Sequence, residues 1–207
     1  MTLGPHLRRL LSLGSAPLAA GPLDGLPEGR HGDDLAEVLS LRNGFVAFES
    51  ALLVRGAGDG PHDLASWNAY PGWRGSYSGL ADGIFFFAED IFGGQFGLTE
   101  VAVVAFDPET GDRQVLAPDL ESWAQGLLVD YASMTGFPLG HAWQQRFGAL
   151  PMGRRLIPKT PFVLGGDFEV DNLYSVDAVV GMQVRAELAV QIRDLPDGAQ
   201  VSYRVVD

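Results

Sequence analysis

The sequence predicts an α+β fold: a small antiparallel sheet flanked by helices, followed by an α+β extension at the C-terminal end. Short runs of β-branched and aromatic residues alternate with turn residues between positions 84 and 117. Helical spacing of apolar residues precedes and follows these runs. The 207 residues, 46% hydrophobic and 19% charged, have the composition of a globular protein. We expect an irregular segment at 1–32, a domain at 33–131, and an extension at 132–207 that packs on or continues that domain.

The first expected helix lies within residues 33–43. Residues 1–32 are rich in Gly and Pro and are expected to be mostly irregular. Asp34 and Glu37 have the spacing of a capping box, which predicts the helix start. Asn43-Gly44 supplies a stop signal. The mainly apolar run 45–54 is compatible with a strand, and residues 55–61 are expected to form a loop.

The middle of the chain is expected to form the sheet. A short helix opens near Asp63 and is closed by Pro71-Gly72. Strands are predicted at 84–88, 96–99, 101–106 and 113–117, with DPETGD at 107–112 as a hairpin connection. Pro118-Asp119 then opens an amphipathic helix whose apolar residues Leu120, Trp123, Leu127, Leu128 and Tyr131 keep helical spacing.

The C-terminal extension has weaker signals. We predict a short helix at 141–147, a strand at 162–170 broken by two glycines, and a helix at 186–193. Residues 172–183 are compatible with either a strand or a helix. A turn at 195–198 leads to a last strand at 200–206, which shows clean alternation.

Composition and charge narrow the function classes. The chain has no cysteine, which excludes disulfides, thiol catalysis and thiolate metal sites. Residues 61–130 contain eleven acids and two bases, and therefore hold −9 of the net charge of −12. Such a charge repels nucleic acid and attracts a basic partner. No apolar run is long enough to span a bilayer, and polar residues interrupt the N-terminal apolar stretch, so we expect a cytoplasmic protein.

The stretch FFFAEDIFGGQF, residues 85–96, is the main candidate for chemistry. Burial beside phenylalanines would raise the pKa of a carboxyl group and create a general acid. However, adjacent residues of a strand point to opposite faces, so Glu89 and Asp90 cannot flank one substrate unless the chain turns there. Gly93-Gly94 indicates a turn nearby, and acids at a turn are normally solvated. We therefore favour a bend between two buried strands.

Other catalytic and metal-binding patterns are missing from the sequence. The four histidines never occur in pairs at ligand spacing, which argues against a zinc site. The sequence contains neither a G-x-S-x-G elbow nor a P-loop lysine nor a twelve-residue calcium loop. We therefore expect neither a metal nor a cofactor, although a triad assembled from distant residues would leave no local signal.

The order of these features resembles the SUKH superfamily, the Smi/Knr group named after a yeast regulator of cell-wall synthesis. The resemblance covers residues 33–131 and rests on RNGF at 42–45, WN at 67–68, FFFAEDIFGGQFGL at 85–98, VVAFDPETGD at 103–112 and LESW at 120–123. The family-motif positions that we expect to serve structure are Trp67, Asn68, Phe85, Phe87, Gly93, Gly94, Phe96, Asp107, Gly111 and Trp123.

Bacterial proteins similar to this superfamily are mostly immunity proteins, which bind and neutralise a secreted toxin. The resemblance thus implies a non-catalytic protein that binds a basic toxin domain through an acidic surface. The alternatives are a regulatory or assembly module of the Smi/Knr type and a small hydrolase that uses Glu89 or Asp90. The sequence assigns no oligomeric state. The candidate partner-binding acids are Asp63, Asp82, Glu89, Asp90 and Glu100.

Overall fold

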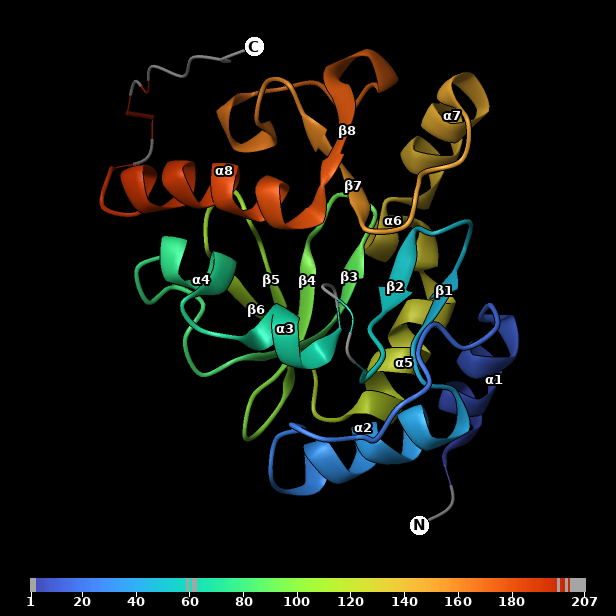
Figure 1. Cartoon of the computed structure of the whole chain (residues 1–207). Coiled ribbons are helices and arrows are strands. Elements are labelled where there is room, and N and C mark those ends of the chain that lie inside the picture. Colours follow the sequence, from blue (N-terminus) through green and yellow to red (C-terminus); the bar gives the residue numbers. More distant parts are fainter. Residues whose placement is uncertain (1–2, 59, 61–62, 197, 200, 202–207) are drawn as a thin grey trace.

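The protein is described here by a computed structural model covering residues 3–58, 60, 63–196, 198–199 and 201. Its centre is a six-stranded antiparallel sheet in which the strands lie side by side in chain order (Figure 1). The strands are β1 Phe45–Ala47, β2 Leu52–Val54, β3 Phe85–Asp90, β4 Gln95–Leu98, β5 Val103–Phe106 and β6 Arg113–Ala117. Helices cover the sheet on both sides, so the predicted fold class is confirmed.

One face of the sheet packs against α1 Pro5–Leu13, α2 Arg30–Leu41 and α5 Leu120–Val129. Phe87 of β3 and Phe96 of β4 both pack edge-on against Trp123 of α5. Their ring centroids lie 5.0 and 5.5 Å, respectively, from that of Trp123. Asp119 begins α5 by accepting a hydrogen bond from the Ser122 backbone N–H, as its position predicts.

The N-terminal region differs from expectation in two respects. Residues 14–29 form no helix or strand, as expected for most of 1–32, but residues 5–13 form α1, which buries Leu7, Leu10 and Leu11 against the sheet domain. Pro5 is compatible with this helix because it occupies the first turn, where a proline costs no hydrogen bond. The start of α2 is also earlier than expected. Gly29 is its N-cap, so the capping box predicted from Asp34 does not form.

The opposite face packs against α3 Leu64–Asn68, α4 Gly72–Ser76 and α8 Ala178–Ile192. Asp63 caps α3 by accepting a hydrogen bond from the Ser66 N–H at 2.7 Å. Phe86 lies in this core while Phe87 lies in the other, and both are almost completely buried. Strand β3 is therefore covered on both sides.

The rest of the extension packs beyond the end of the sheet (Figure 1). α6 Tyr131–Thr135 and α7 Phe137–Phe147 follow α5, and β7 Arg154–Pro158 pairs with β8 Leu173–Asp177 in a separate two-stranded sheet. The ambiguous residues 172–183 thus contain all of β8 and the start of α8. The prediction of a strand at 162–170 is wrong, because short 3₁₀ helices form at Phe162–Leu164 and Val170–Asn172. The predicted strand 200–206 lies, except for residue 201, outside the described residues.

Within the described part of the chain, no helix combines the length and apolar character that a membrane span requires.

Candidate functional site

The two acids at the end of β3 point to opposite faces of the sheet. Glu89 pairs with Gln95, and its side chain faces α3 and α8. The carboxyl group of Asp90 lies on the opposite face, on the side of α5 and α6. The expectation that both lie in a solvated turn is wrong, because both belong to the strand and the turn follows at 91–94. The expectation that they cannot flank one substrate together is confirmed by these directions.

Glu89 is the centre of a buried ionic cluster. Its carboxylate contacts the Arg55 guanidinium at 2.7 Å and the Arg155 guanidinium at 2.8 Å, and all three side chains are at most 3% exposed. Gln95 donates a hydrogen bond to Glu89 at 3.0 Å and accepts one from Trp67 Nε1 at 2.9 Å. The Arg55 guanidinium lies 3.4 Å from the centroid of the Trp67 ring, within cation–π distance.

These contacts fix the charge of Glu89. Burial alone would raise the pKa of its carboxyl group, but Arg155 and Arg55 outweigh that effect and hold the pKa below its ordinary value. Burial lowers the pKa of Arg55 to about 10, against the attraction of Glu89. Both partners are therefore charged at neutral pH, and Glu89 acts as an ionised anchor within the core.

Asp90 organises the turn that follows β3. Its Oδ1 accepts hydrogen bonds from the backbone N–H groups of Phe92 and Gly94, both at 2.8 Å. Gly93 has a φ of 78°, a conformation that favours glycine, so the predicted role of the Gly-Gly pair in a turn is confirmed. Desolvation raises the pKa of Asp90 to about 7, although both backbone hydrogen bonds favour the ionised form.

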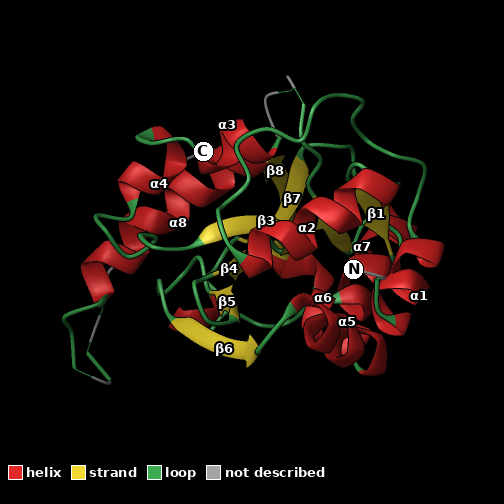
Figure 2. Cartoon of the chain, turned by 90° about the horizontal axis from the view of Figure 1, so that it is seen from below, coloured by secondary structure: helices red, strands yellow, loops and turns green. Residues whose placement is uncertain are grey.

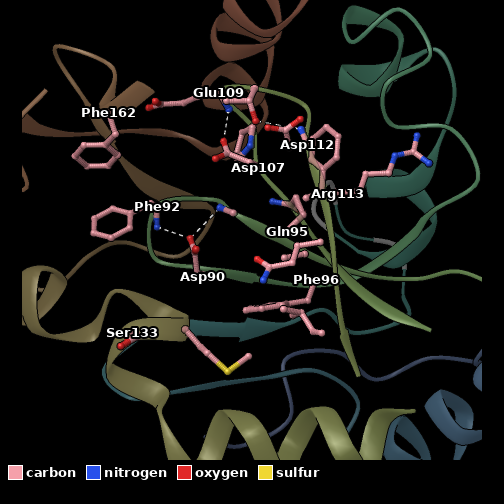
Figure 3. Close-up of a pocket in the computed structure, with 18 of the residues that line it drawn as sticks. Asp90, Phe92, Gln95, Phe96, Asp107, Glu109, Asp112, Arg113, Ser133 and Phe162 are labelled. Atoms are coloured by element: carbon pink, nitrogen blue, oxygen red, sulfur yellow. Dashed lines mark hydrogen bonds between the residues drawn. The ribbon is translucent and has the colours of Figure 1, made fainter. Parts of the chain in front are cut away.

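A groove of about 860 Å³ lies beside Asp90, over the part of the sheet that α5 leaves uncovered (Figure 3). Its floor is largely apolar and comes from β4, β5, β6 and α5. Residues 162–168 and the β5–β6 turn form two further sides. The apolar lining includes Phe96, Leu116, Trp123, Met134 and Phe168, the last of which is 70% exposed.

Carboxylates gather on one side of this groove. Figure 3 shows Asp107, Glu109 and Asp112 together at the β5–β6 turn, with Asp90 below them. Asp107 accepts a hydrogen bond from the Glu109 N–H at 2.7 Å, and Glu109 accepts one from the Val163 N–H at 2.9 Å. Burial raises the pKa of Glu109, whereas Asp107 and Asp112 are exposed.

The two arginines that line the groove are held by main-chain contacts. Arg113 donates from Nε to the Leu80 carbonyl at 3.0 Å. Arg185, on α8, donates to the Phe92 carbonyl at 2.6 Å and to the Gly181 carbonyl at 2.9 Å. The groove thus holds four carboxyl groups and two arginines.

The five candidate partner-binding acids do not form one surface. Asp63 and Glu89 are buried and belong to no exposed surface, because Asp63 caps a helix and Glu89 is ion-paired in the core. Asp82 and Glu100 are exposed but do not line the groove. Asp90 alone among the five lines it, and the acidic turn 107–112 was interpreted only as a hairpin.

Several of the positions that carry the sequence resemblance have structural roles. The Asn68 side chain forms two hydrogen bonds with the backbone of Phe86, near the start of β3. It donates to the Phe86 carbonyl at 2.8 Å and accepts from the Phe86 N–H at 2.8 Å. Trp67 and Trp123 are buried in the two main cores, and Gly111 has a φ of 74° in the β5–β6 turn. Among the residues that the structure describes, no group of His, Cys, Asp and Glu side chains is arranged to hold a metal ion.

No family model and no curated protein sequence matches this chain. The fold is similar to that in the crystal structure of Atu4351 from Agrobacterium tumefaciens, with a TM-score of 0.57. The match covers 86% of this chain and 87% of that chain at 14% sequence identity. The coverage is greater than residues 33–131 alone could supply. At this identity the similarity establishes a shared fold, and that fold includes much of the C-terminal extension.

Proposed function

We propose that the protein is a non-catalytic immunity protein, which neutralises a toxin by binding a basic toxin domain in the acidic groove. The observation that carries this proposal is the groove itself, in which Asp90, Asp107, Glu109 and Asp112 border an apolar floor. The resemblance of residues 33–131 to the SUKH superfamily supplies the biological class.

The groove combines two contributions to binding. An apolar floor provides area that is removed from water on association. Exposed carboxylates at the rim attract a basic partner during the encounter, an effect that increases the association rate and weakens as salt is added. Arginine and lysine side chains of the partner would pair with Asp107 and Asp112, while its apolar side chains would cover Phe96 and Leu116.

One observation favours the hydrolase alternative, namely that the pKa of Asp90 is about 7 and that its carboxyl group lines a groove. Its expected partner Glu89, however, points to the opposite face and is held by two arginines. Asp90 itself already binds the turn 91–94 through two hydrogen bonds. These contacts favour docking over proton transfer.

The first step of the test is to read the genes beside this gene in its genome. Where one of them encodes a toxin domain, that domain is produced as a catalytically inactive variant. Association rates are measured at low and high salt for wild type, for Asp107→Asn with Asp112→Asn, and for Asp82→Asn with Glu100→Gln. The last pair is a matched control, because it also removes two exposed charges but lies outside the groove.

The groove variant should bind at least about tenfold more slowly at low salt, with little change in the control. In cells that express the active toxin, the groove variant should also rescue growth less well than the wild type and the control variant do. Equal effects of the two variants, or no effect of either, would contradict the proposed site. A neighbouring gene that encodes no toxin, in an unrelated operon, would favour the regulatory module instead.

A further inference from the structure

Among the strands of the described residues, β6 lies at an edge of the main sheet and has β5 as its one neighbour. Figure 2 shows β6 at the outer margin of the sheet. Arg113, Gln114 and Val115 are exposed, and Val115 is 70% exposed although it is apolar. An exposed edge strand presents unpaired backbone groups to which another chain can bind.

The two edges of the sheet differ. At the β1 edge, the Val46 carbonyl accepts a hydrogen bond from the Ser15 N–H at 2.8 Å, and the Val46 N–H donates to the Ser15 hydroxyl at 3.2 Å. The segment after α1 therefore occupies that edge. Among the described residues, no segment outside the sheet makes a backbone hydrogen bond of this kind to β6.

The register of β5 and β6 identifies the outward groups. The Asp107 N–H donates to the Asp112 carbonyl at 3.0 Å, which makes this a hydrogen-bonded pair. Hydrogen-bonded and non-hydrogen-bonded pairs alternate in an antiparallel ladder, so Gln114 bonds to Ala105 while Arg113 and Val115 do not bond to β5. The N–H and C=O groups of Arg113 and Val115 therefore point away from the sheet.

We propose that the partner binds by adding an extended strand to β6, with basic side chains directed over the acidic groove. This inference rests on the function proposed above and specifies how the partner is held. Side chains on one face of the added strand would lie next to Gln114 and Leu116, which line the groove. Those on the other face would lie next to Val115, and main-chain hydrogen bonds would form with Arg113 and Val115.

The charge beside β6 favours a basic segment over a second copy of this chain as the strand that binds to this edge. A second copy would bring another chain of net charge −12 to an edge that lies beside Asp107 and Asp112. Two surfaces of the same charge sign repel one another. A segment that carries Lys or Arg would instead place its cations near Asp107 and Asp112, whose side chains are exposed.

The test uses the full chain and a capped peptide of about eight residues that alternates lysine and valine, a typical strand length. Two matched peptides serve as controls: one alternates glutamate and valine, and the other is the lysine peptide with N-methyl groups on alternate amides. Amide hydrogen exchange is followed by NMR. The lysine peptide should slow amide exchange at Arg113 and Val115 by about tenfold or more. It should change the exchange rate of the Gln114 amide little. Neither control peptide should do so.

Two variants add a test on the protein side. Val115→Pro removes an outward N–H that is not part of the ladder, whereas Val115→Thr keeps that N–H and a similar shape. The proline variant should bind the lysine peptide at least about tenfold more weakly than the threonine variant. If the proline variant does not fold, the N-methylated peptide tests the same hydrogen bonds on the wild-type protein.

The outcomes separate this inference from the proposed function. Salt-dependent binding of the lysine peptide without protection at Arg113 and Val115 would overturn strand addition and leave the acidic groove as the binding site. Protection by both the lysine and the glutamate peptides would support strand addition and count against the role of charge. The inference is also overturned if the lysine peptide at about 1 mM protects neither amide, or if protection depends on protein concentration alone, as in self-pairing.

Discussion

Replacement of Glu89 by glutamine tests whether the buried ionic cluster is a structural anchor. The substitution keeps the size of the side chain and removes its charge. Arg55 and Arg155 would then remain in the core without the carboxylate that they contact at 2.7 and 2.8 Å. The other carboxylates near them are already engaged, because Asp63 caps α3 and Asp90 binds the turn that follows β3.

The expected loss of stability is large. Removal of one partner from a buried ion pair costs about 3–5 kcal/mol, because an uncompensated charge stays buried. Natural domains are stable by about 5–15 kcal/mol, so the loss would take away a large share of the total. With a urea dependence of about 2 kcal/mol/M, a loss of about 4 kcal/mol lowers the unfolding midpoint by about 2 M.

The assay is urea unfolding followed by tryptophan fluorescence, because Trp67 lies against Arg55 and reports directly on the cluster. Asp82→Asn is the matched control: it also converts an acid to its amide, but at an exposed position, and should change stability by less than about 0.5 kcal/mol. If Glu89→Gln lowered stability by no more than the control does, the view of Glu89 as an anchor would be wrong.

Acid titration gives a second measure of the same cluster. The pKa of Glu89 is lower in the folded protein than its ordinary value, so its contribution to stability is present above the unfolded-state pKa. This contribution is lost as the pH falls through the folded-state pKa. The free energy of unfolding of the wild type should therefore decrease in acid more steeply than that of Glu89→Gln.

Three further substitutions test other parts of the structure. Asp90→Asn keeps the oxygen that accepts the hydrogen bonds of the turn. It should stabilise the protein at pH 8 but not at pH 4, because a folded-state pKa of about 7 makes the ionised form of Asp90 unfavourable in the folded protein. Urea unfolding measured at pH 8 and at pH 4 checks this. Asn68→Ala should cost about 2–3 kcal/mol in the same urea assay, because the N–H and C=O of Phe86 lose their partners; an unchanged unfolding midpoint would contradict this role. Gly97→Ala should cost about 1–3 kcal/mol in thermal unfolding, because its Cβ would lie 2.1 Å from the Ile84 side chain; an unchanged melting temperature would contradict this packing.

Local signals explain why the middle of the fold could be predicted. The strands between 85 and 117 are consecutive in the sheet, so short-range turns and alternation determine their order. The caps Asp63 and Asp119 also act within three residues. By contrast, α1 lies in a segment rich in Gly and Pro, and it depends on burial of Leu7 and Leu10 against a domain that folds from later residues.

The candidate site was less predictable because it depends on contacts between distant residues. Glu89 is buried by Arg55 from before β3 and by Arg155 from β7, and neither pairing leaves a pattern in the sequence near Glu89. The groove exists because α5 covers only part of the sheet, which no local spacing specifies. The acidity of DPETGD was visible in the sequence, but its place beside Asp90 required the sheet register.

The different roles of Glu89 and Asp90 depend on one irregularity in β3. Simple alternation from Phe87, which faces α5, would direct Glu89 to the same face and Asp90 to the face of α8. The register instead shifts between Phe86 and Ala88, so that Ala88 pairs with Phe96 and Glu89 pairs with Gln95. A β-bulge of this kind inserts one residue and reverses the directions that follow. It therefore places the acid with the lowered pKa in the core with its arginines and leaves the acid with the raised pKa at the groove.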